Sequence, residues 1–165
     1  MKISHKIVPC LWFDTQGEEA ANFYVGIFKN SKITHMSRFG KEGYEIHRKP
    51  EGAVMTVVFE LDGQTFTALN GGPDFKFNEA ISLQVYCDTQ QEIDHYWDKL
   101  SAGGDKNAQQ CGWLKDKYGV SWQVVPSIIG ELFGEKVTDK SERAMKAMLQ
   151  MKKLDIAKLQ AAYQG

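Results

Sequence analysis

The sequence has few cysteines, few prolines and no long apolar segment, and each shortage excludes a class of protein. Its three cysteines, Cys10, Cys87 and Cys111, are odd in number and far apart, which matches neither a disulfide framework nor a CxxC metal or redox pattern. We interpret them as reduced, buried thiols. No apolar run approaches the ~20 residues that span a bilayer, and residues 1–6 lack the apolar core of a signal peptide. We therefore expect a cytoplasmic protein without a membrane segment.

The chain also has no large excess of positive or negative charge. The formal net charge is −1, and no long run of Lys or Arg is present. The chain therefore lacks the extended basic surface that nucleic acid or an anionic membrane would attract. With 165 residues, of which 42% are hydrophobic, it can bury a substantial core. We expect a globular protein whose partner is a small molecule rather than nucleic acid or a membrane.

One five-residue segment occurs twice. Asp14-Thr15-Gln16-Gly17-Glu18 returns as Asp88-Thr89-Gln90-Gln91-Glu92, 74 residues later (88 − 14). Each copy follows an apolar run, at 6–13 or 80–87, that is typical of a strand. Thr followed by Glu three residues later is a capping box, and apolar residues at helical spacing come next. The repeat therefore predicts one supersecondary unit used twice.

Further strands are predicted after each helix. In the first module they lie at 31–39, 53–61 and 64–69, and Asp62-Gly63 between the last two is a strong hairpin signal. The polar segment 40–52 is predicted to be a mobile flap. In the second module, strands are predicted near 111–114 and 120–125.

The composition changes after Pro126. Asp139 with Glu142 and then Asp155 are predicted to cap two helices. The first of these carries Met145, Met148 and Leu149 on one side, with Met151 as a further candidate, and this apolar side requires a surface to bury against. The tail belongs to neither copy of the repeat, so it is predicted to pack on a sheet or on another subunit.

Four sequence blocks resemble a known family. They are PCLWFDTQGEEAANFY, LDGQTFTALNGGPDFKFNEAISLQV, HYWDKLSAGG and CGWLKDKYGVSWQVVP. They are similar to the PhnB-like family, which is catalogued as 3-demethylubiquinone-9 3-methyltransferase. That family is a branch of the vicinal oxygen chelate superfamily, with the glyoxalases, bleomycin-resistance proteins and extradiol dioxygenases.

The resemblance implies an α+β fold in which two βαβββ modules form curved mixed sheets around a cavity, followed by C-terminal helices. It implies a glyoxalase-like domain over 1–126, with module one at about 6–72 and module two at about 79–126. Residues 127–165 would be a helical extension of the same domain. Relatives in the superfamily commonly complete their sheet and cavity across a subunit or module interface, and a homodimer is expected with either arrangement.

The resemblance also locates the positions at which metal-dependent relatives carry His, Gln or Glu ligands. They fall here on Pro9, Ser82 and Gln123, with Thr67 or Asn70 as the fourth. Proline cannot bind a metal, serine is a weak ligand, and one neutral amide does not make a metal site. We therefore expect no metal and no other cofactor.

Strand alternation would place the same positions and their neighbours on inward faces. The predicted ligand-binding residues are Leu11, Phe13, Asn70, Phe75, Phe77, Ser82, Gln84, Tyr86, Trp113 and Gln123. A filled core, in which these polar groups satisfy one another, is the alternative. Trp12, Trp97 and Trp122 are predicted to pack between helix and sheet.

Three functions follow from these expectations. The first is a glyoxalase-like protein that binds a small, mostly apolar organic molecule without a metal, with its reaction unassigned. The second is a metal-dependent lyase or oxygenase, to which Gln123, His35 or His47 would contribute, or a methyltransferase as the family name suggests. The glycine-rich turn between strand and helix that commonly holds a nucleotide-derived donor is absent from the sequence. The third is an interaction module formed by the tail. Whether the protein is an enzyme stays open.

Overall fold

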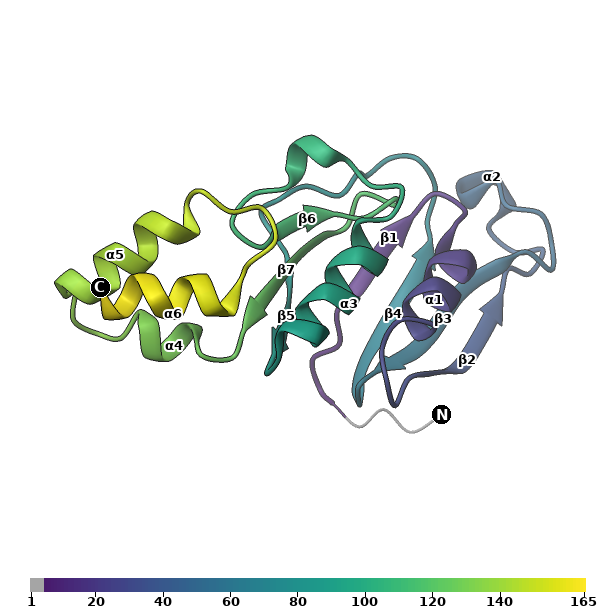
Figure 1. Ribbon diagram of the computed structural model, residues 1–165. Coiled ribbons are helices and arrows are strands. Elements are labelled where there is room, and N and C mark those ends of the chain that lie inside the picture. The colour runs from purple at the N-terminus through teal and green to yellow at the C-terminus, as the bar shows by residue number, and fades with distance from the viewer. Residues whose placement is uncertain (1–4) are drawn as a thin grey trace. The chain divides into compact units, whose positions relative to one another are not determined.

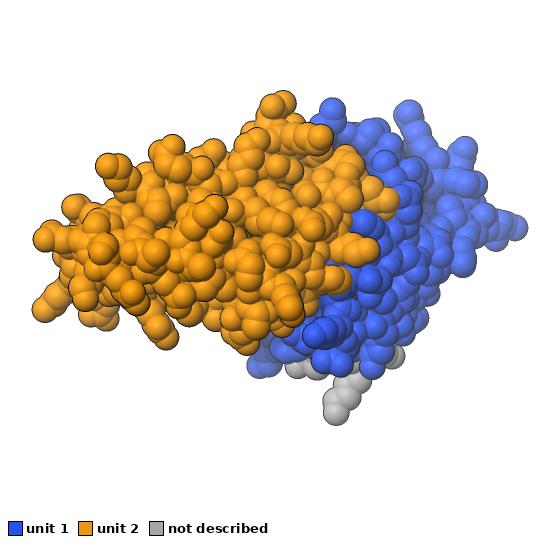
Figure 2. Space-filling model, viewed as in Figure 1, with its two compact units in different colours: residues 1–77 blue, residues 78–165 orange. Residues whose placement is uncertain are grey.

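The computed structural model describes residues 5–165 and divides into two compact units (Figures 1 and 2). Unit 1 comprises residues 1–77 and unit 2 comprises residues 78–165. Residues 1–4, on which the expectation about the start of the chain depends, lie outside the described residues. Both units combine helices with a sheet of parallel and antiparallel strands, which confirms the α+β class. One domain over 1–126 with 127–165 as its extension stays a prediction.

Unit 1 is a four-stranded sheet with one helix on it. Its elements are β1 (Cys10–Phe13), α1 (Gly17–Val25), β2 (Lys32–Arg38), α2 (Tyr44–His47), β3 (Val54–Leu61) and β4 (Gln64–Asn70). The strand order is β1-β4-β3-β2, with β1 parallel to β4 and the other pairs antiparallel. At the predicted hairpin, Leu61 pairs with Gln64, and both Asp62 and Gly63 have positive φ. This is the backbone that a two-residue hairpin turn requires.

Helix α1 covers one face of this sheet. The Tyr24 ring stacks on Phe59 of β3 with 6.2 Å between ring centroids, and both side chains are buried. The β-strand alternation puts Val57 and Ala68 on the same face, where they are also buried. The core of unit 1 therefore lies between α1 and strands β3 and β4 (Figure 1).

The start of α1 differs from the sequence prediction. Thr15 and Glu18 were expected to form a capping box, but the N-cap is Gln16, and no side chain of this segment caps the helix in the described part of the chain. Instead the Gly17 N–H donates to Asn70 Oδ1 from β4 at 2.7 Å. A Cβ atom at position 17 would lie 2.7 Å from the same oxygen, so the contact requires glycine. A tertiary acceptor thus replaces the local cap.

The polar segment 40–52, which was predicted to be a mobile flap, contains a helical turn. Helix α2 brings His47 against Phe39, with ring centroids 4.5 Å apart. His47 Nε2 lies 3.1 Å from the Glu42 carbonyl oxygen, and the Lys49 N–H donates to Nδ1 at 3.0 Å. Both ring nitrogens therefore contact backbone groups of the loop. Mobility of the segment stays a prediction.

Unit 2 has a three-stranded sheet. Its elements are β5 (Leu83–Cys87), α3 (Gln90–Ser101), η1 (Lys106–Ala108), β6 (Trp113–Lys115), β7 (Ser121–Pro126), α4 (Ile129–Leu132), α5 (Asp139–Met148) and α6 (Ile156–Gln164). The strand order is β5-β7-β6, with β5 parallel to β7. The second copy of the repeat is therefore βαββ, one strand shorter than the expected βαβββ. The polar residues 105–110 account for the difference, because Asp105 accepts from the Asn107 N–H at 2.8 Å and begins a 3-10 turn there.

The second copy of the five-residue repeat caps its helix as predicted. Thr89 Oγ1 accepts from the Glu92 N–H at 3.2 Å, and Glu92 Oε2 accepts from the Asp88 N–H at 2.8 Å. Helix α3 then buries Trp97 against the sheet, and Trp122 of β7 is buried as well. For these two tryptophans the predicted core role is confirmed.

The tail packs within unit 2. Val125, Leu132, Leu154 and Leu159 form a buried cluster, and Met148 packs against it. Helix α5 is capped by Thr138 and Ser141 rather than by Asp139 and Glu142, whereas Asp155 caps α6 as predicted. No helix among residues 5–165 has both the length and the apolar character needed to cross a membrane.

Candidate functional site

Each sheet has a face that its helix does not cover, which we call the far face. On β5 and β7 of unit 2, the helix-covered positions include Val85, Trp122 and Val124, all of which are buried. Alternation places Ser82, Gln84, Tyr86 and Gln123 on the far face. The prediction for these four residues therefore agrees with the strand register.

The four residues form one continuous chain of hydrogen bonds, which we call the amide row. The Tyr86 hydroxyl donates to Gln84 Oε1 at 3.1 Å, and Gln84 Nε2 donates to Gln123 Oε1 at 3.3 Å. Gln123 Nε2 then donates to Ser82 Oγ at 2.7 Å. Each amide retains a second N–H and each carbonyl a second lone pair for a further partner. Tyr86 is 59% exposed, so one end of the row reaches solvent.

Strand β6 adds an aromatic ring and a charge to the same face. Trp113 pairs with Gln123 in the antiparallel register, and Lys115 pairs with Ser121. Lys115 forms an ion pair with Glu79. The hydrogen bond from Lys115 is the main reason why the pKa of the Glu79 carboxyl is below its ordinary value. Ser121 Oγ is buried and has no hydrogen-bond partner among residues 5–165.

The predicted site residues of unit 1 lie elsewhere. In the β1–β4 register, Leu11 pairs with Ala68 and Phe13 pairs with Asn70, on the face that α1 covers. Phe13 is only 3% exposed and contacts Phe77, with 5.2 Å between ring centroids. Leu11 and Phe13 are thus placed with the core rather than on the far face.

Asn70 has a structural role in this arrangement. Besides accepting from Gly17, it donates through Nδ2 to the Val54 carbonyl oxygen at 3.0 Å. It is 6% exposed. The side chain therefore connects α1, β4 and the start of β3.

Trp12 and Cys10 occupy the far face of unit 1. Trp12 was expected to pack between helix and sheet, but it pairs with Leu69 on the opposite side from α1. Its Nε1 donates to the Gly72 carbonyl oxygen at 2.8 Å, and its ring contacts Phe75 edge to face at 4.9 Å. The ring packs so closely on Gly71 that a Cβ atom there would lie 2.2 Å from it. Trp12 is therefore a rigid aromatic surface that sequence reasoning missed.

The repeat itself contained the missing signal. Subtracting its 74-residue offset from Gln84 and Tyr86 of the far face in unit 2 gives Cys10 and Trp12 in unit 1. The expected inward residues of β1, Leu11 and Phe13, differ from this repeat-based pair by one residue. A shift of one residue moves every side chain of a strand to the other face.

This difference predicts contrasting reactivity of two cysteines. Cys87 is buried, and burial, followed by the charges of Glu92 and Asp88, raises its pKa to about 12. Cys10 is exposed, which corrects the expectation that all three thiols are buried, and partial desolvation of its thiol also raises its pKa. Because the thiolate is the reactive form, we expect iodoacetamide to modify Cys87 more than about tenfold more slowly than Cys10 in the native protein. Peptide mass spectrometry measures both rates, and labelling in denaturant provides the reference. Equal native rates would contradict the assignment of β1 faces.

The residues that the structure describes contain no group of three or more His, Cys, Asp or Glu side chains arranged to hold a metal ion. His35 and His47 lie on β2 and α2, respectively, and His47 is engaged with the loop backbone. Neither histidine belongs to the amide row.

Comparison with known structures identifies the class of fold. The PhnB protein from Bacillus cereus is 36% identical to this chain, over 74% of this chain and all of the PhnB chain, with a TM-score of 0.65. A protein from Pseudomonas aeruginosa is 20% identical over 74% of this chain and 98% of its own, with a TM-score of 0.56. The fosfomycin resistance protein FosX from Listeria monocytogenes, complexed with Mn(II) and sulfate, is 14% identical over 79% and 95%, with a TM-score of 0.52. The fold is that of the glyoxalase and bleomycin-resistance proteins of the vicinal oxygen chelate superfamily.

The sequence defines the family within that class. Residues 5–125 match the family model described as 3-demethylubiquinone-9 3-methyltransferase, and the chain belongs to this PhnB-like family. No curated protein matches the chain.

Proposed function

We propose that the protein binds a small, mostly apolar organic molecule on the far face of unit 2, with its polar group against the amide row. The observation that carries this proposal is the ordered hydrogen-bond chain from Tyr86 to Ser82, which has unused donors and acceptors at each amide. Trp113 beside Gln123 supplies apolar surface. A few fixed polar groups within apolar surroundings are typical of small-molecule sites.

The donor atoms of this face do not fit a divalent cation. Ser82, Gln84 and Gln123 are neutral, and each already hydrogen-bonds to another member of the row. Divalent metal sites in proteins are usually built from several carboxylate, imidazole or thiolate ligands. The proposal therefore includes a metal-independent mode of binding. The chemistry that the row offers is orientation of a carbonyl or hydroxyl group by neutral hydrogen bonds.

A thermal-shift screen with neutral, oxygen-bearing aromatic compounds tests this proposal. A ligand at 100 times its dissociation constant should stabilise the wild type by about 2.7 kcal/mol. Gln123→Ala and Ser82→Ala remove one hydrogen bond each to the ligand or its neighbour, so we expect about tenfold weaker binding. Titration calorimetry measures the dissociation constants of the hits.

Gln64→Ala is a matched control, because the Gln64 side-chain amide donates to the Thr65 carbonyl oxygen of its own strand and takes no part in the amide row. It should bind the hits as tightly as wild type does. If the hits bind Gln123→Ala and Ser82→Ala with unchanged affinity, the amide row is not the binding site.

Methyl transfer is the second candidate, because the description of the matching family names that reaction. It requires a place for a methyl donor. Gly71 and Gly72 follow β4, but they contact Trp12 and do not open a helix. Incubation with a methyl-labelled nucleotide-derived donor and a panel of phenols tests this candidate, and transfer of label that depends on the protein would favour it over binding alone.

A further inference from the structure

A pocket in the tail lies between α4 and α6 (Figure 1). Its lining residues fall between positions 128 and 164, whereas the family model matches residues 5–125. Its volume is about 260 Å³, which is the volume of about nine water molecules at about 30 Å³ each. The pocket therefore has room for a small organic molecule and belongs to a part of the chain outside the matched family range.

Each of the two helices contributes one side to this pocket. The lining residues recur at spacings of three and four, which places them on one side of a helix. They are Ile128, Glu131 and Leu132 at α4, and Gln160, Tyr163 and Gln164 at α6.

The lining has an apolar part and a polar part. Leu132 belongs to the buried cluster of the tail, and Ile128 and Tyr163 pack against that cluster. We call these three residues the apolar lining. The other three, Glu131, Gln160 and Gln164, are exposed, and we call them the polar lining. An apolar surface with a few polar groups beside it is typical of small-molecule sites.

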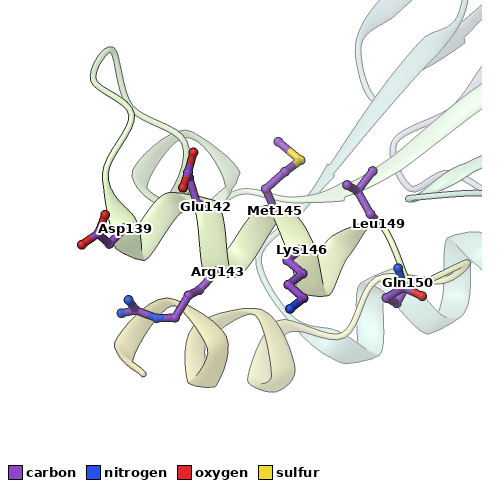
Figure 3. Close-up of a pocket in the computed structure, with 7 residues that line it drawn as sticks. All are labelled: Asp139, Glu142, Arg143, Met145, Lys146, Leu149 and Gln150. Carbon is purple, nitrogen blue, oxygen red and sulfur yellow. The ribbon is translucent and has the colours of Figure 1, made fainter.

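The only charge in this lining, among the residues that the structure describes, is the carboxylate of Glu131. Glu131 forms no ion pair with another residue of the range 5–165. The larger groove along α5, of about 730 Å³, differs in this respect, because acidic and basic side chains line it together (Figure 3). The charge of the smaller pocket therefore favours a cation, whereas that of the larger groove selects no class of ligand.

Two cations of α5 approach α6, but both are engaged with it. Figure 3 shows Arg143 extending from α5 beside the end of α6, where it donates to the carbonyl oxygens of Ala162 at 3.1 Å and Tyr163 at 2.9 Å. Lys140 Nζ lies 5.7 Å from the centroid of the Tyr163 ring. The ring therefore already has a cation, and what it offers to a ligand is apolar surface.

We propose that the pocket between α4 and α6 binds a small primary ammonium compound that carries an apolar group. The ammonium group pairs with the Glu131 carboxylate, and the side-chain carbonyl oxygens of Gln160 and Gln164 provide further acceptors. Its three N–H donors equal these three acceptor groups in number. The apolar group covers the apolar lining, and its removal from water favours binding. This site is separate from the amide row, which lies on β5 and β7.

Titration calorimetry with three compounds of similar size tests the preference for a cation. 2-Phenylethylamine carries an ammonium group at neutral pH, 2-phenylethanol is uncharged and phenylacetate is an anion. At low ionic strength the amine should bind the wild type about fivefold more tightly than the alcohol, and the anion should bind most weakly. The difference should shrink at high salt, because Glu131 is exposed.

Variants at exposed positions locate the binding without disturbing the core. Glu131→Gln should abolish the fivefold preference for the amine over the alcohol. Gln160→Lys adds a cation to the polar lining, so it should weaken binding of the amine at least about fivefold and strengthen that of phenylacetate. Glu135→Gln removes the same charge from an exposed position of the tail outside the pocket and should bind like wild type.

Gln123→Ala separates this pocket from the amide row. It should bind the amine as tightly as wild type does, because Gln123 lies on β7 and does not line the pocket. A variant that loses the amine would place the compound at the amide row and would overturn the proposal. So would the absence of saturable binding of the amine up to about 10 mM, equal or tighter binding of the alcohol or the anion by the wild type, or an unchanged preference in Glu131→Gln.

Discussion

Replacing Asp116 with alanine is expected to lower the free energy of unfolding by about 3 to 4 kcal/mol, through loss of a buried hydrogen-bond network. Asp116 is 2% exposed, and its Oδ1 accepts from the N–H groups of Tyr118 at 2.9 Å and Val120 at 3.0 Å. Its Oδ2 accepts from Trp122 Nε1 at 2.8 Å. One carboxylate therefore fixes the β6–β7 turn and attaches it to the core. Urea denaturation measures the change.

Asp105→Ala is the matched control for Asp116. Asp105 also accepts from a backbone N–H two residues later, but it is exposed, so its replacement should cost no more than about 1 kcal/mol. An equal cost for the two variants would contradict the network interpretation.

Asp116→Asn tests the individual hydrogen bonds of the Asp116 network. The amide retains one acceptor oxygen but places an N–H₂ group among partners that all donate. Trp122→Phe removes one of those donors, so the loss caused by Asp116→Asn should be smaller in that background. A double-mutant cycle measures this coupling, and additive effects would show that the side chains of Asp116 and Trp122 do not interact.

Replacing Asn70 with alanine is expected to cost about 2 to 3 kcal/mol, because one buried and one partly buried backbone group lose their partners. These groups are the Gly17 N–H at the start of α1 and the Val54 carbonyl oxygen on β3. Hydrogen exchange offers a residue-specific measurement. The Gly17 amide should be protected in wild type and should exchange rapidly in the variant.

Asn22→Ala provides the comparison for Asn70. Its amide donates to the Glu18 carbonyl oxygen at 2.9 Å, but the contact is exposed. The change in stability should stay within about 0.5 kcal/mol, as is usual for surface substitutions. An unprotected Gly17 amide in wild type, or equal costs for the two asparagine variants, would contradict the role assigned to Asn70.

Sequence patterns predicted local structure well where a local signal and the tertiary contact agreed. Thr89 and Glu92 cap α3, Asp62-Gly63 turns the β3–β4 hairpin, and Asp155 caps α6. Each of these depends on groups a few residues apart. Where a distant group offered a better partner, the local prediction was wrong. Thr15 and Glu18 resemble Thr89 and Glu92, yet α1 receives its acceptor from Asn70.

The candidate site was predicted in part. The four residues of the amide row were named from strand alternation, and the structure brings their side chains into one hydrogen-bonded chain. Leu11 and Phe13 were expected on an inward face, but the register of β1 places them on the face that α1 covers. The same register places Trp12 on the far face, although it was expected between helix and sheet. A single residue of register decides between core and far face, and pattern alone does not resolve it.

The sequence by itself determined the family, the duplicated β-α-β arrangement and the α+β class, because periodicity and turn residues are local properties that repeat along the chain. Only the tertiary structure decided which face of β1 meets α1, that the second copy lacks a strand, and that Asn70 supports the fold. These features depend on hydrogen-bond partners far apart in sequence, such as Gly17 and Asn70. The tail shows the same division: its helices were predicted from spacing, but only packing determined that Met148 is buried while Met145 and Leu149 face outward.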